Sequence, residues 1–202
     1  MIAIIDYVVG NLSSVFNAFQ AIGVEAEITN DHHKIRAADK IILPGVGAFK
    51  AGMSNLQKLG LIELLHDEVM TKKKPFLGIC LGMQLIFTKS YEDGETAGLD
   101  WIKGEVVRFD VEKQGLRVPH IGWNEVKCDT NSLLFKGGSE LQHFYFVHSF
   151  YPVSQEKVSI GKCHYGSDFT AVLQKGNIFA TQFHPEKSQH EGLELLRKFA
   201  ML

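Results

Sequence analysis

A cysteine lies between two glycines in the segment Gly78-Ile79-Cys80-Leu81-Gly82. The residues before it are typical of a buried strand, and residues 81–87 are typical of the first turns of a helix. Cys80 is therefore predicted on a sharp strand-to-helix turn, whose strained backbone requires residues without a Cβ atom two positions before and after it. Backbone N–H groups at a helix N-terminus favour the thiolate, which is the reactive form of cysteine. The spacing predicts a nucleophile.

The other two cysteines, Cys128 and Cys163, have no such flanking glycines, and we interpret them as small core residues. Three cysteines are an odd number, and their spacing does not resemble a set of metal ligands. The sequence therefore predicts no metal site and no disulfide framework, and it favours a reducing compartment.

Composition limits the function classes. The 202 residues include 45% hydrophobic and 22% charged side chains, which is enough for one substantial core. The formal net charge of -2 gives no basic field for nucleic acid or an anionic membrane. Asp6 interrupts the apolar start too early for a signal peptide, and no run approaches the roughly 18 apolar residues of a membrane span. A cytoplasmic protein is expected, and the basic run Lys72 to Lys74 is interpreted as the solvated end of a helix.

The first half of the chain alternates strand and helix patterns. Continuous apolar runs predict strands at residues 2–5, 24–28, 41–43 and 76–79. Apolar residues at helical spacing predict helices around residues 15–22, 51–59 and 61–70. This alternation is typical of a mostly parallel sheet with helices on both faces, so we expect an α/β fold of flavodoxin-like or Rossmann-like type.

The second half changes in character from residue 101 to residue 183. Short runs rich in Val, Phe and Tyr alternate with turn residues and predict strands at 106–109, 118–121, 144–147 and 178–183. An amphipathic helix is expected over residues 192–201. Because no linker or repeat divides the chain, these extra strands are expected to belong to one domain, residues 1–202.

A histidine and a carboxylate follow the last predicted strand, in the segment Gln182 to Glu186. If the strand continues through this segment, His184 and Glu186 project to the same side, because side chains alternate with period two. A cysteine nucleophile needs an imidazole to carry its proton, and that imidazole needs an acceptor that fixes its tautomer. We therefore predict that His184 and Glu186 complete a triad with Cys80, although His120, His143 and His148 are competing histidines.

A glycine-rich loop, Pro44 to Phe49, follows the predicted strand 41–43. Such loops lie at the carboxyl edge of a parallel sheet, where α/β proteins bind ligands, and Cys80 is expected at the same edge. The loop and the N–H of Leu81 can supply donors to an oxyanion. A simple tight turn is the alternative, while a phosphate cradle lacks both of its usual glycine motifs.

These segments, in this order, resemble the class I (triad) glutamine amidotransferases, and among them the glutaminase subunits of imidazole glycerol phosphate synthase. The resemblance covers essentially the whole chain. The motifs that carry it are Ile5-Asp6-Tyr7 with Gly10-Asn11-Leu12, Pro44 to Phe49, Leu77 to Gln84, Pro119 to Asn124, Phe144 to Ser149 and Gln182 to Ser188.

The resemblance implies that Cys80 attacks the side-chain amide of L-glutamine, that His184 protonates the departing ammonia, and that Glu186 orients His184. It also implies a heterodimer in which a (β/α)₈ cyclase subunit uses the ammonia for histidine biosynthesis, without any cofactor in the glutaminase. We therefore expect glutamine and the oxyanion to be bound by Val46, Gly47, Leu81 and Gln84. The resemblance also implies that the partner-facing positions are Asn11, Trp123, Tyr145 and Lys187.

One position departs from the family pattern. The family usually has glycine directly after Asp-Tyr, whereas this chain has Val8. A β-branched residue strongly disfavours positive φ, so we expect the first strand-to-helix loop to follow another path.

Three other functions remain open at this point. A paralogous glutaminase that feeds a sugar amidotransferase in surface polysaccharide synthesis is favoured by Val8 and by the divergent stretch Lys89 to Ala97. A non-catalytic subunit has no chemical need for all three triad residues. A stand-alone cysteine hydrolase predicts full activity without any partner.

Overall fold

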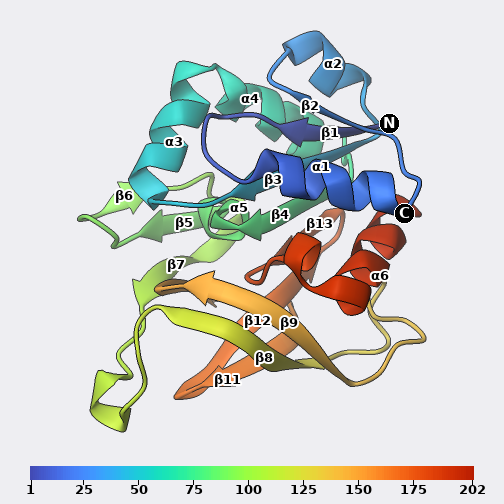
Figure 1. The fold of residues 1–202 in the computed structure, drawn as a ribbon. Coiled ribbons are helices and arrows are strands. Elements are labelled where there is room, and N and C mark those ends of the chain that lie inside the picture. Colours follow the sequence, from blue (N-terminus) through green and yellow to red (C-terminus); the bar gives the residue numbers. More distant parts are fainter.

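The computed structural model describes all residues, 1–202. Its largest element is a nine-stranded sheet (Figure 1). Neighbouring strands are parallel from β2 to β13 and antiparallel from β13 to β9. In sheet order the strands are β2 (Ala26–Thr29), β1 (Ile2–Ile5), β3 (Lys40–Gly45), β4 (Phe76–Cys80), β13 (Ile178–Thr181), β12 (Ser167–Lys175), β11 (Ser159–Tyr165), β8 (His120–Cys128) and β9 (Leu141–His148).

The second half of the chain adds strands to this unit, as the sequence predicts. The sheet is nevertheless parallel in only one part. Strands β12, β11, β8 and β9, which all follow residue 119, make only antiparallel pairs, and β12 joins them to β13. A smaller sheet stands beside it in the order β10 (Phe150–Ser154), β7 (Ile102–Arg108), β5 (Phe87–Ser90) and β6 (Thr96–Ala97). The α/β class is confirmed, with a mixed central sheet.

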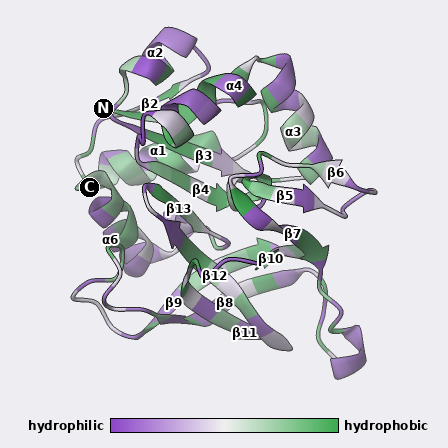
Figure 2. Cartoon of the chain, turned by 180° about the vertical axis from the view of Figure 1, so that it is seen from behind, coloured by the Kyte–Doolittle hydropathy of each residue, from purple (hydrophilic) through white to green (hydrophobic).

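Helices cover both faces of the parallel part. The helices are α1 (Leu12–Ala21), α2 (His32–Ala37), α3 (Phe49–Lys58), α4 (Leu61–His66), α5 (Leu81–Leu85) and α6 (Gln189–Ala200), with a π-helical turn (Asp67–Thr71) and 3₁₀ turns η2 (Glu112–Gln114) and η3 (Pro185–Lys187). Alternate residues of β1 enter two cores: Ile4 packs with α1 and α6, whereas Ile5 packs with α3 and α4. Apolar residues therefore gather in the central strands (Figure 2).

Several element boundaries differ from the sequence prediction. The helix after Cys80 ends at Leu85, and Phe87 begins β5. Strand β8 begins at His120, after Pro119, because proline has no N–H to donate to a ladder. Lys74 is not solvated, since its side chain is 10% exposed and its Nζ lies 2.8 Å from the buried carboxylate of Glu68.

Val8 adopts positive φ, against the local preference from which a different loop path was expected. Its φ is 71°, in the left-handed region that glycine adopts without strain, and its side chain is exposed. The loop is held at both sides of this residue: the N–H of Val8 donates to Oδ1 of Asp6 at 3.1 Å, and Tyr7 is fully buried. These contacts override the torsional preference of valine, at a cost of about 1–3 kcal/mol.

Val8→Gly is therefore expected to raise the free energy of unfolding by about 1 kcal/mol, because relief of strain exceeds the added entropy of the unfolded chain. Urea denaturation of both proteins measures the difference. Val153→Gly is the matched control: Val153 is also exposed but lies in β10 without positive φ, so glycine should destabilise there. A destabilised Val8→Gly variant would contradict the strain argument.

Candidate active site

Cys80 is the last residue of β4 and directly precedes α5, as the sequence predicts. Its φ of 53° and ψ of -105° lie outside the backbone regions that residues other than glycine normally adopt. Such strain persists only where the surroundings enforce it, and it is concentrated at functional sites. Cys80 therefore has the backbone of a nucleophile elbow.

The two flanking glycines are required by space. A Cβ atom on Gly78 would lie 2.7 Å from the carbonyl oxygen of Gly82, and one on Gly82 would lie 1.8 Å from the carbonyl oxygen of Leu43. Both contacts are with backbone, which cannot move aside. The prediction that these positions must lack a Cβ is confirmed.

His184 and Glu186 lie beside each other, with Nδ1 of His184 2.8 Å from Oε1 of Glu186 and both side chains 2% exposed. The predicted pair is confirmed, but the predicted reason is wrong. Strand β13 ends at Thr181, and Pro185 begins the 3₁₀ turn η3. The turn, rather than strand alternation, brings the carboxylate back to the ring.

The surroundings of His184 favour its charged form. Burial opposes the charge, but Cys80 and Glu186 outweigh it and raise the pKa of His184 to about 10. Nε2 of His184 makes no hydrogen bond, although Cys80 is close enough to contribute to this shift. One ring nitrogen is therefore fixed by Glu186, and the other is available for proton transfer.

The competing histidines are unsuited to act as the base. His143 is 62% exposed on the surface. His120 and His148 use both of their ring nitrogens in hydrogen bonds. Burial lowers the pKa of His120 to about 4 and that of His148 to about 3, so both rings are neutral. His184 is the histidine whose geometry and charge suit a cysteine nucleophile.

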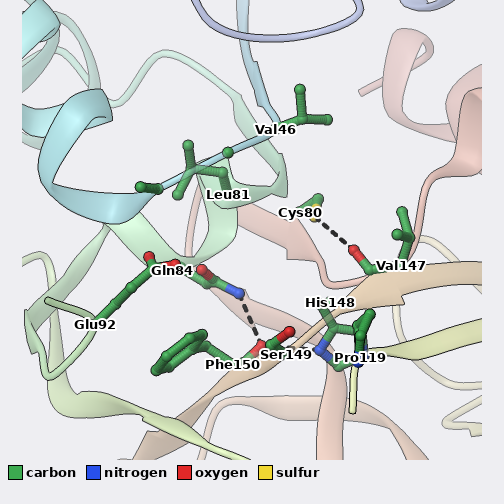
Figure 3. A pocket seen from close by; sticks show the side chains of 12 residues that line it. Val46, Cys80, Leu81, Gln84, Glu92, Pro119, Val147, His148, Ser149 and Phe150 are labelled. Carbon is green, nitrogen blue, oxygen red and sulfur yellow. Dashed lines mark hydrogen bonds between the residues drawn. The ribbon is translucent and has the colours of Figure 1, made fainter. Parts of the chain in front are cut away.

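Cys80 opens into a cavity of about 480 Å³ (Figure 3). Every residue predicted from the sequence to bind the substrate or the oxyanion lines it together with Cys80. The lining residues are Val46, Gly47, Ala48, Cys80, Leu81, Gln84, Glu92, Pro119, Val147, His148, Ser149 and Phe150. The glycine-rich loop and the nucleophile elbow thus meet at one edge of the sheet, as predicted.

Polar contacts fix the cavity wall. Nε2 of Gln84 donates to the carbonyl oxygen of Phe150 at 2.9 Å and to Oε1 of Gln182 at 3.2 Å. Nε2 of Gln182 lies 3.7 Å from Sγ of Cys80, whose thiol in turn faces the carbonyl oxygen of Val147 at 3.9 Å. The amide groups therefore connect the cavity wall with the sulfur.

Glu92 is a cavity residue that the sequence reasoning missed. Its Oε2 accepts a hydrogen bond of 2.7 Å from the N–H of Phe49, the first residue of α3. It is the one acidic side chain among the lining residues. Glu92 lies in the stretch Lys89 to Ala97, which was interpreted only as divergent from the family. No local pattern marks it, because the loop between β5 and β6 carries it to the cavity from outside the main sheet.

Three of the four predicted partner-facing residues form one patch. Trp123 and Tyr145 are opposite each other on β8 and β9 with ring centroids 6.3 Å apart, and Nζ of Lys187 lies 5.9 Å from the Tyr145 ring centroid. Asn11 is exposed and caps α1, because its side-chain oxygen accepts a hydrogen bond from the N–H of Ser14. Helix α1 packs against η3, the turn that contains Lys187. Ile121, also exposed on β8, is an apolar neighbour that the sequence reasoning did not include.

No group of three or more His, Cys, Asp or Glu side chains is arranged to hold a metal ion. None of the helices has the length and apolar character needed to cross a membrane.

Comparisons with known proteins show the family of the chain. The family model of class-I glutamine amidotransferases matches residues 3–202. The chain is 51% identical to imidazole glycerol phosphate synthase subunit HisH 1 of Campylobacter jejuni over 100% of both chains. It is 48% identical to the HisH subunit of Moorella thermoacetica over 100% of this chain and 94% of that one. A crystal structure of a glutamine amidotransferase has the same fold, with a TM-score of 0.74 at 17% identity and 99% coverage of both chains. The chain belongs to the class I glutamine amidotransferases.

Proposed function

We propose that this chain is the glutaminase subunit of an imidazole glycerol phosphate synthase. It hydrolyses L-glutamine to L-glutamate and delivers the ammonia to a cyclase subunit. The observation that carries the chemistry is the strained Cys80, which opens into a cavity and lies close to the buried pair of His184 and Glu186. The names of the HisH relatives, identical to this chain at up to 51% over its full length, support the choice of synthase.

In the first half of the reaction, the Cys80 thiolate attacks the γ-amide carbon and forms a carbon–sulfur bond. His184 donates its proton to the leaving nitrogen, the carbon–nitrogen bond breaks, and ammonia departs from a γ-glutamyl thioester. In the second half, His184 takes a proton from water, which adds to the thioester and releases glutamate and the thiolate. Glu186 stabilises the imidazolium throughout.

The negative oxygen formed in each half needs donors. The N–H of Leu81 is the first of helix α5, where N–H groups have no partner within the helix. Val46 and Gly47 face the same cavity, and Gly47 has a φ of 100°, a conformation that glycine adopts without strain. We assign the second donor to this loop.

The cavity wall also suits the rest of the substrate. The carboxylate of Glu92 is complementary to the α-ammonium group of glutamine, and Gln84 and Ser149 offer neutral polar groups nearby. We assign the patch of Trp123, Tyr145 and Lys187, together with Asn11, to the docking of the (β/α)₈ cyclase. The full chain, residues 1–202, acts as one glutamine amidotransferase domain.

Glutaminase assays with the subunit alone, with a cyclase subunit, and with a sugar amidotransferase test the assignment. The cyclase with its acceptor substrate is expected to raise turnover about 10²- to 10³-fold, the size of one missing oxyanion donor. Activation by the sugar enzyme alone would favour the polysaccharide paralogue. A high rate without any partner would indicate an independent hydrolase, and no activity in any arm would indicate a non-catalytic subunit.

A further inference from the structure

Two buried histidines that the mechanism does not use lie next to each other on strands β8 and β9, and one of them, His148, also lines the cavity. His120 and His148 are register partners on β8 and β9, and Nδ1 of His120 lies 3.0 Å from Nε2 of His148. Nε2 of His120 lies 3.1 Å from Nδ2 of Asn124, and Nδ1 of His148 lies 2.8 Å from the carbonyl oxygen of Phe150. The two rings therefore form one hydrogen-bonded chain from Asn124 to Phe150.

Only one arrangement of donors and acceptors is possible along this hydrogen-bonded chain. The Phe150 carbonyl can only accept, so Nδ1 of His148 carries hydrogen and its Nε2 is an acceptor. Nδ1 of His120 must then donate to that acceptor, which leaves Nε2 of His120 to accept from the Asn124 amide. Each ring is neutral and each nitrogen is used, in agreement with the lowered pKa values of both histidines.

The hydrogen-bonded chain continues beyond the carbonyl of Phe150. The same carbonyl oxygen accepts from Nε2 of Gln84, which also donates to Gln182, the amide next to Sγ of Cys80. His148, Phe150 and Gln84 all face the cavity (Figure 3). A change in the His148 ring therefore reaches the cavity wall and the sulfur through consecutive hydrogen bonds.

His120 is itself held firmly. Its ring stacks on Tyr165 with centroids 4.1 Å apart and on Phe146 with centroids 4.9 Å apart, and its side chain is buried. This packing alone does not require a histidine, since a phenylalanine ring would also stack. The donor at Nδ1 is what a phenylalanine would lack.

We infer that His120 is a positioning residue of the glutaminase site. It holds His148 in the tautomer that bonds the Phe150 carbonyl, and through that carbonyl it keeps Gln84 and Gln182 in place beside Cys80. The inference rests on the proposed function and adds a residue to it that touches neither the substrate nor the sulfur.

Two variants of His120 separate the hydrogen bond from the packing. His120→Phe keeps the stacking and removes the donor, whereas His120→Asn keeps an amide N–H near the place of Nδ1 and removes the stacking. We expect kcat for glutamine to fall about tenfold in His120→Phe, the size of one lost hydrogen bond, with KM changed less than kcat. His120→Asn should retain most of the activity. The reverse order of the two activities would show a packing role and overturn the inference.

The matched control is Tyr165→Phe. This substitution removes a hydroxyl that donates to the carbonyl oxygen of Arg117 at 2.7 Å. Tyr165 belongs to the same aromatic layer as His120 but not to the hydrogen-bonded chain, so kcat should be unchanged. Equal losses in Tyr165→Phe and His120→Phe would contradict a specific role for His120.

A spectroscopic readout keeps the inference testable even if a variant does not fold. Nitrogen-15 spectra of the imidazole rings in the wild-type protein should show His148 and His120 protonated on Nδ1 only. Wild-type His148 protonated on Nε2 would overturn the inference whatever the activities are. Absence of glutaminase activity in the wild type with every partner, with this tautomer present, would instead contradict the proposed function.

Discussion

Cys80→Ala is expected to reduce glutamine hydrolysis by about 10⁴- to 10⁶-fold, because it removes the atom that forms the bond to the substrate. The fold should remain intact, since the sulfur makes only weak contacts, at 3.7 and 3.9 Å, and alanine at this backbone conformation is strained no more than cysteine. Steady-state assays with the activating partner measure the loss, and a thermal melt checks the fold.

Cys128 and Cys163 are matched controls. Both are buried, and burial raises the pKa of each thiol to about 12, so neither is reactive near neutral pH. Cys128→Ala should retain full turnover, and a glutamine analogue with an electrophilic γ-carbon should label Cys80 alone. A label on either control cysteine, or near wild-type turnover in Cys80→Ala, would exclude Cys80 as the nucleophile.

The elbow could be predicted from sequence because its constraints are local. A strained turn needs two positions without Cβ atoms, and Gly78 and Gly82 stand at those positions within five residues of chain. The glycine-rich loop was predictable in the same way, because parallel strands end at the same edge of a sheet. Features fixed by neighbours in the chain are visible in the chain.

Features fixed by distant contacts were not visible. Glu92 reaches the cavity because its loop lies over the start of α3, which joins residues 43 positions apart. The hydrogen-bonded chain from the Asn124 side chain to the Gln182 side chain depends on the pairing of β8 with β9 and on the placement of Gln84 opposite Phe150. Val8 shows the converse, since a strong local preference was overridden by Asp6 and the buried Tyr7.

His184→Ala is expected to lose about as much activity as Cys80→Ala, since the members of a catalytic unit are not additive. Without the imidazole, nothing in the cavity protonates the leaving ammonia, because His148 is neutral with both nitrogens bonded. The same assay on His148→Ala is the comparison. If His148→Ala were the inactive protein and His184→Ala retained wild-type turnover, the assignment of the base would be wrong.

Glu186→Gln separates orientation from proton transfer. The amide oxygen can still accept from Nδ1 of His184, but the charge that helps to raise the pKa of His184 is gone, so this pKa should fall from about 10. Turnover should fall about 10²- to 10⁴-fold, less than in His184→Ala, because the proton carrier remains. His184 would lose its proton at lower pH, so the alkaline limb of the kcat profile should move to lower pH. An unmoved limb would mean that Cys80 alone sets the charge of His184.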